Sequence, residues 1–305
     1  MLLHRWLLMI ALSSIACADD PDSSTLPDAG AESDATVEET VDFDARSRRA
    51  AIHAGGSFAI SQAKAVTSAF IKEDPTIDPQ KSAAENADAI AAQIQAATAT
   101  TCPTLTLTHA ASSATLTVSF PTSGCSVNDV TVSGQVAIQV TAMTGLVKVS
   151  FQFTALSVEG HVLEGTVEES TTNGTTYSTK VTSLVADGVT YDYEGTQTLD
   201  GDLRGVTLNG SGSSSKSGDT HPTTYSVATV HQKFGACYPD SGTMSLTSKE
   251  DVTVGRRTVT VTTTESVLFD ANTPSDGTVD VTVTISGSSP VTKTVTLPAY
   301  GECPP

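Results

Sequence analysis

Aromatic residues and cations are scarce in this chain of 305 residues. Phe, Trp and Tyr make up 5% of the residues, and 16 Lys and Arg stand against 34 Asp and Glu, which gives a formal net charge of −18. A chain this acidic lacks the basic surface that nucleic-acid-binding proteins need, so we expect no nucleic acid among its partners. The few aromatics also disfavour a membrane-spanning barrel, because such barrels carry aromatic girdles at both membrane interfaces.

Motifs for catalysis and metal binding are equally sparse. The sequence contains no His-Glu-x-x-His and no Gly-x-Ser-x-Gly motif. Ser-x-x-Lys occurs at residues 61–64 and 213–216, but the Lys-Thr-Gly strand motif that accompanies it in serine β-lactamases is missing. Asp270–Asn272 begins like a calcium loop, yet Pro274 stands at the next ligand position. The sequence therefore predicts no enzyme activity, no cofactor and no metal site.

The first 17 residues are typical of an export signal. His4 and Arg5 precede an apolar run from Trp6 to Leu12, and small residues then lead to Cys17. This run is shorter than the about 20 apolar residues of a membrane-spanning helix. Residues 14–17 resemble a bacterial lipobox, although Ser14 stands where an aliphatic residue is usual, and the resemblance implies acylation of Cys17 and a membrane anchor. The small residues around Cys17 also fit general signal peptidase, whose cleavage would give a soluble protein starting at Asp19.

Residues 18–45 are acidic and low in complexity. They contain ten acidic residues and no basic residue. Self-repulsion and the lack of apolar periodicity predict a disordered tether. A flexible coil of this length would hold a folded domain on the order of 30 Å from its anchor.

Helical periodicity is confined to residues 46–100. A first helical piece extends from Ser57 to Lys72 and stops before Asp74-Pro75. A second piece is predicted to begin with Asp78 as N-cap and Pro79 at the first helical position. Its apolar residues recur at spacings of three and four, which predicts one stripe that packs closely on a helix or sheet: Ala83, Ala84, Ala87, Ile90, Ala91, Ile94 and Ala97.

From residue 101 to residue 305 the hydrophobic period is two. Residues 147–153, 258–261 and 278–285 alternate apolar and polar, which predicts strands with one buried face and one Thr/Ser-rich face. The serines between Gly210 and Gly218 indicate a flexible loop. The fold class is mainly β (α+β): a large antiparallel meander, arranged as a sandwich, an open barrel-like sheet or a curved sheet, with the short Ala-rich helical section packed on it. Turns are predicted at five residue pairs: Asn173-Gly174, Asp187-Gly188, Asp200-Gly201, Asn209-Gly210 and Asp276-Gly277.

Five cysteines are present, and either fate of Cys17 removes it from disulfide pairing. The segments from Cys102 to Cys125 and from Cys237 to Cys303 begin and end alike, each opening with a proline-containing turn before a Thr-rich strand. A duplicated module explains this likeness and predicts the disulfides Cys102–Cys125 and Cys237–Cys303, each contributing about 2–4 kcal/mol. Without a Cys-x-x-Cys pair, the four are better explained as disulfides than as zinc ligands.

The signal ending at Cys17, the acidic stretch, the Ala-rich helical section before Cys102-Pro103 and the segment from Cys237 to Thr243 together resemble uncharacterised lipoproteins of myxobacterial and related bacterial envelopes. The resemblance implies an envelope location on the outer membrane or the periplasmic face, with no activity assigned. We therefore expect a non-catalytic, lipid-anchored envelope protein with a structural or surface-binding role. Its partners would be the membrane and a polysaccharide or protein surface. The alternatives are a soluble secreted or periplasmic protein, and a carrier that holds a lipid or other apolar ligand between sheet and helices. The oligomeric state stays open.

Overall fold

The structure is a computed structural model that describes residues 78–97, 102–127, 130–158, 160–186, 188–202, 204–233, 236, 238–254 and 257–297. The predicted signal peptide, the acidic tether of residues 18–45 and the first helical piece from Ser57 to Lys72 lie outside these residues.

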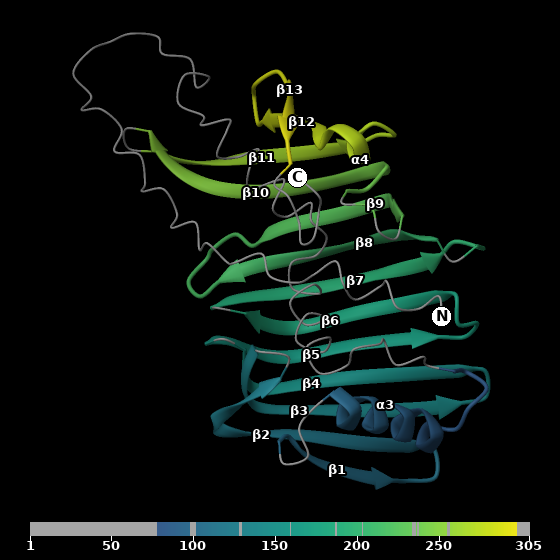
Figure 1. Ribbon diagram of the computed structural model, residues 1–305. Helices are drawn as coiled ribbons and strands as arrows, with labels where there is room; N and C mark the ends of the chain where they lie inside the picture. Colours follow the sequence, from purple (N-terminus) through teal and green to yellow (C-terminus); the bar gives the residue numbers. More distant parts are fainter. Residues whose placement is uncertain are drawn as a thin grey trace.

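One antiparallel sheet of thirteen strands dominates the described part of the chain (Figure 1). Each strand pairs with the strands before and after it in the sequence, so the predicted antiparallel meander is confirmed. The strands form a single open sheet and not a sandwich. They are β1 (Thr104–His109), β2 (Ser113–Val127), β3 (Val130–Met143), β4 (Leu146–Val158), β5 (His161–Thr171), β6 (Thr176–Ala186), β7 (Val189–Leu199), β8 (Gly205–Lys216), β9 (Thr223–Lys233), β10 (Ser241–Val254), β11 (Arg257–Phe269), β12 (Thr278–Ile285) and β13 (Val291–Thr296).

The alternation of apolar and polar residues gives this sheet two different faces. Successive side chains of a strand point to opposite faces, so a constant register collects the apolar ones on one side. We call this side the apolar face. Its central row crosses all thirteen strands in register: Leu107, Leu116, Ile138, Phe151, Val167, Val181, Tyr193, Gly212, Tyr225, Leu246, Glu265, Val283 and Val291.

The register shifts all lie on one side of this central row, and the shift between β6 and β7 begins directly at Val181. One shift between β5 and β6 involves Gly165, which has a φ of 122°. A Cβ atom at this position would lie 2.5 Å from the carbonyl oxygen of Ser183. Gly165 is therefore required both for its backbone conformation and for the close approach of β6.

Helix α3 (Ala83–Ala97) begins with a capping box. The hydroxyl of Ser82 accepts a hydrogen bond from the backbone N–H of Glu85 at 3.2 Å, and the Glu85 carboxylate accepts one from the backbone N–H of Ser82 at 2.8 Å. The Ser82 hydroxyl also donates to that carboxylate, and this bond, followed by the backbone one, lowers the pKa of Glu85. The predicted start at Asp78 and Pro79 is therefore wrong. Asp78 instead forms a turn before the helix, where its side chain accepts a hydrogen bond from the N–H of Gln80 at 2.9 Å.

The alanine-rich stripe of α3 packs on the apolar face, as predicted. Ala87, Ile90 and Ile94 are at most 1% exposed, and the helix lies over β1, β2 and β3 (Figure 1). Full burial of an aliphatic side chain of this size contributes about 1.5–3 kcal/mol. Ile90 and Ile94 belong to the same buried cluster as Leu116 of β2 and Ile138 of β3.

Strand β8 contradicts two predictions. The predicted turn at Asn209-Gly210 and the predicted serine-rich loop after it both lie largely inside this strand. Gly210 and Gly212 face the apolar side, where the rings of Tyr193 and Tyr225 lie over them. These rings are stacked with centroids 6.1 Å apart and an interplanar angle of 8°. Glycine is used in this strand because the rings occupy the space of its side chains.

Near the C-terminus, β10 and β11 extend beyond their neighbours. Residues 249–254 and 257–262 pair only with each other among the described strands. Val259 is consequently 50% exposed, so the prediction that every strand buries one face is wrong for this hairpin. The single turn α4 (Thr273–Asp276) follows β11 and ends at Gly277, whose φ of 66° makes it the left-handed C-cap.

Candidate functional site

The face of the sheet opposite the apolar face is lined mainly by hydroxyl, amide and charged side chains, and we call it the hydroxyl face. Its central row also crosses all thirteen strands in register, and every member is polar: Thr108, Thr115, Gln139, Ser150, Glu168, Lys180, Glu194, Ser211, Ser226, Ser245, Ser266, Thr282 and Thr292. Because neighbouring strands lie about 4.8 Å apart, this row is about 55–60 Å long.

Hydroxyl groups on this face also bond across neighbouring strands. The hydroxyls of Thr282 and Thr292 lie 2.8 Å apart, and those of Thr247 and Thr264 lie 3.3 Å apart. Each hydroxyl can donate one hydrogen bond and accept others, so capacity remains for a ligand in contact with the face.

Charged residues occupy the centre of the row. Glu168, Lys180 and Glu194 stand on consecutive strands β5, β6 and β7, and Lys148 of β4 bonds to Glu168 at 2.7 Å. With Ser170 they help to line a depression of about 310 Å³. Two cations and two anions balance one another, so the depression has no net charge to attract an ionic ligand.

Aromatic side chains do not contribute to the hydroxyl face in the described strands. The Phe and Tyr residues of the strands belong to the apolar-face register, as Phe151, Tyr193 and Tyr225 illustrate. Recognition on the hydroxyl face would therefore rely on hydrogen bonds and not on ring stacking.

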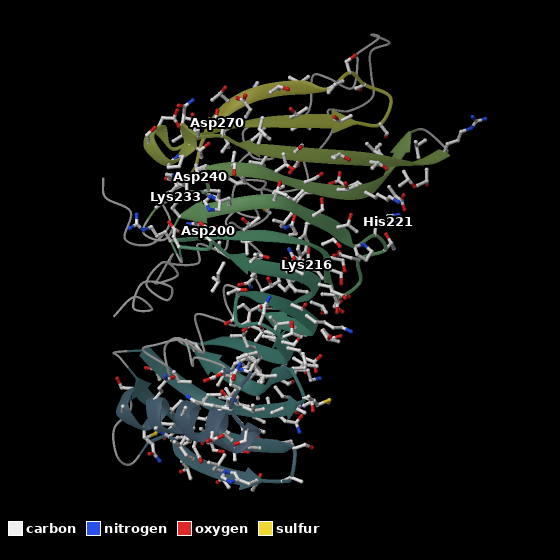
Figure 2. The ribbon with its side chains drawn as sticks, turned by 90° about the vertical axis from the view of Figure 1, so that its right-hand side faces the viewer. Asp200, Lys216, His221, Lys233, Asp240 and Asp270 are labelled. Atoms are coloured by element: carbon white, nitrogen blue, oxygen red, sulfur yellow. A yellow bond between two sulfur atoms is a disulfide. The ribbon has the colours of Figure 1, made fainter. Side chains whose placement is uncertain are left out.

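A second polar cluster surrounds His231, at one end of the strands. Its Nε2 lies 3.0 Å from a carboxylate oxygen of Asp200, its Nδ1 bonds to Asp240, and Lys233 lies 3.2 Å from the other oxygen of Asp240. Figure 2 shows Asp200, Lys233 and Asp240 gathered there, away from Lys216 and His221. The cluster joins the β7–β8 and β9–β10 connections.

Electrostatics in this cluster favour a fixed imidazolium. The hydrogen bonds to Asp200 and then Asp240 raise the pKa of His231. Burial alone would raise the pKa of Asp240, but the bonds from His231 and Lys233 outweigh it and lower that pKa. Because both ring nitrogens bond to carboxylates, the ring has no free nitrogen to act as a general base. We interpret the cluster as a structural tie.

The sequence could not have indicated this cluster, because Asp200 and His231 are far apart in the chain and meet only through strand pairing. The Ser-x-x-Lys match at residues 213–216 fails for a similar reason. It lies on β8, where Ser213 and Lys216 belong to opposite faces and cannot form a nucleophile–base pair.

Of the five cysteines for which the sequence predicts a role, the structure describes two. The structure pairs Cys102 with Cys125, with Cα atoms 6.1 Å apart, which joins the start of β1 to the far part of β2. Cys125 lies within β2 and not after its end. Cys17, Cys237 and Cys303 lie outside the described residues, so acylation and the second disulfide stay predictions.

Comparison of the chain with known protein families, curated proteins and solved structures finds no match. Within the described residues, no group of three or more His, Cys, Asp or Glu could hold a metal ion. No helix in the same part of the chain has the length and apolar character to cross a membrane.

Proposed function

We propose that this protein is a non-catalytic, lipid-anchored cell-envelope protein that binds a polysaccharide through its hydroxyl face. The observation that supports this proposal most directly is the central row of the hydroxyl face, which crosses all thirteen strands without an apolar member. A row of this kind offers donors and acceptors at every strand, as an extended polyhydroxylated chain requires.

A polysaccharide fits this face better than a protein does. Protein interfaces depend on a core of apolar and aromatic anchor residues. The described strands direct their Phe and Tyr residues to the apolar face, and the exposed Leu268 and Met143 on the hydroxyl face lie outside its central row. The balanced charge of the depression favours a neutral polymer over an anionic one.

Native gels cast with dissolved polymers test the ligand. Dextran and mannan serve as neutral probes and alginate as an anionic probe. We expect at least one neutral polymer to retard the protein with little dependence on salt, and K180A/E194A to weaken the retardation several-fold. D202A/R204A is the matched control, because it also removes one exposed charge of each sign, in the β7–β8 connection, and should bind like the wild type. The proposal would be wrong if no polymer retards the protein, if alginate alone does, or if both variants behave alike.

The anchor is tested separately by intact-mass analysis of the membrane fraction. A mature chain that begins at an acylated Cys17 is the expected result, because residues 14–17 resemble a lipobox and the acidic tether would hold the domain away from the membrane. A chain beginning at Asp19 would make the protein soluble and would leave the binding proposal intact.

A further inference from the structure

The apolar face over strands β5–β9 is buried, although no described helix lies on it. Leu163, Val181 and Leu184 are at most 2% exposed. Helix α3 lies over β1–β3, and α4 follows β11 near the other end of the sheet (Figure 1). Strands of one sheet cover the flanks of a side chain but not its outer end, because side chains stand perpendicular to the sheet. A second layer must therefore cover this area.

We infer that the second layer is residues 46–77 of the same chain. This segment joins the described part at Asp78, and the adjacent Pro79 lies at the β5–β6 connection. Its Cδ atom is 3.9 Å from the position that a Cβ atom on Gly174 would take. The segment thus leaves the described structure at the border of the area that needs a cover. The other terminal segment, residues 298–305, is much shorter and starts after β13, at the far end of the sheet.

The length of the segment suits this area. The helix predicted from Ser57 to Lys72 has 16 residues and would be about 24 Å long. Strands β5–β9 together span about 19 Å at the usual strand spacing. Phe58, Val66 and Phe70 recur on one side of that helix and would supply its apolar contact surface.

Charge also favours this segment over the acidic tether. Glu169 of β5 and Glu265 of β11 both belong to the apolar face, and Glu265 is 1% exposed. Residues 46–77 hold two acidic residues and five cations, Arg46, Arg48, Arg49, Lys64 and Lys72, whereas residues 18–45 hold no cation.

Two consequences follow for function. An apolar face filled by its own chain has no room at β5–β9 for a carried lipid, so the carrier alternative loses its site. The tether, which joins the cover at Arg46, would also attach on the apolar side. The hydroxyl face would then point away from the anchor.

Photo-cross-linking in the full-length protein tests the inference. Benzoylphenylalanine replaces Tyr191, which is 7% exposed on the apolar face of β7. We expect an intramolecular cross-link to tryptic peptide 50–64 or 65–72, identified by mass spectrometry. The same probe at Ser211, on the hydroxyl face, is the control and should give neither cross-link. A cross-link to a copurified lipid, a cross-linked dimer, or products confined to residues 78–297 would overturn the inference.

A second measurement keeps the test valid if the probe disturbs folding. F58D/F70D in the full chain should raise the fluorescence of an apolar dye several-fold, because the cover would detach from the apolar face. F43D, which places one such charge in the tether, should leave the fluorescence unchanged. Equal fluorescence of F58D/F70D and F43D would contradict the cover.

Discussion

Replacing Gly210 with alanine tests how the middle of the sheet is built, because two principles predict opposite signs. Glycine weakens a strand by about 0.5–1 kcal/mol relative to alanine, and Gly210 has no positive φ that would exclude alanine. On propensity alone, G210A should stabilise the protein. The packing predicts the reverse, since a Cβ atom there would lie 2.5 Å from Cζ of Tyr193 and 2.7 Å from the carbonyl oxygen of Glu194.

The expected loss of stability follows from the contacts that the Tyr193 ring would lose. Moving the ring would break its stacking on Tyr225, worth about 0.5–1.5 kcal/mol, and its hydrogen bond to the carbonyl oxygen of Asn209, worth about as much. Overpacking adds typically 1–3 kcal/mol of strain. Set against the gain of about 0.5–1 kcal/mol from replacing glycine in a strand, these losses predict that G210A lowers the free energy of unfolding by about 1–5 kcal/mol.

Urea unfolding followed by circular dichroism measures this change. G201A is the matched control, because a Cβ atom there meets no atom within 4 Å, and it should stay within about 0.5 kcal/mol of the wild type. Combining G210A with Y193A should show a coupling of at least about 1 kcal/mol. Y193A would restore only part of the stability that G210A removes, because the added Cβ atom would still lie close to the carbonyl oxygen of Glu194. A G210A protein as stable as the wild type would refute the packing argument.

Two further predictions concern the polar ties of the fold. Because the pKa of His231 is raised in the folded state, its bonds stabilise the protein fully below the unfolded pKa of about 6.5 and lose effect as the pH rises through the folded pKa. The stability difference between wild type and H231Q should thus shrink above that pH in urea titrations, and a difference independent of pH would exclude the ion pairs as its source. S82A should lower the free energy of unfolding by about 0.5–2 kcal/mol through loss of the capping box, whereas S275A in the short helix α4 should change it by less than about 0.5 kcal/mol; equal losses would argue against the cap.

The alternation of apolar and polar residues was enough to predict the strands, but it could not predict which side chains of other strands pack against them. Residues 147–153 and 278–285 form the expected strands because alternation is a property of the segment itself. Asn209-Gly210 reads as a turn and is part of a strand, because the ring that fills the glycine's space comes from another strand. The capping box at Ser82 was visible in the sequence as Ser-x-x-Glu, but Asp78-Pro79 offered a competing start signal.

The central row of the hydroxyl face, or hydroxyl row, could not be predicted from the sequence for a different reason. Its members are ordinary polar residues of alternating strands, and they become one row only because the register is kept across all twelve strand pairings. A shift of one residue at any pairing would move every later side chain to the opposite face. Register depends on the bulges and on close contacts such as that at Gly165, which no single segment reveals.

The edges of the sheet also bear on where a partner can bind. An open sheet invites strand addition at its edges unless these are short, charged or interrupted by proline. β13 has only six residues, starts directly after Pro290, and places Lys293 in the apolar-face register opposite Val281. β1 also has six residues, and its start is held by the Cys102–Cys125 disulfide. Both edges offer a partner strand few hydrogen bonds, whereas the hydroxyl row extends over about 55–60 Å. The hydroxyl face of this sheet, and not its edges, is therefore where we expect recognition to take place.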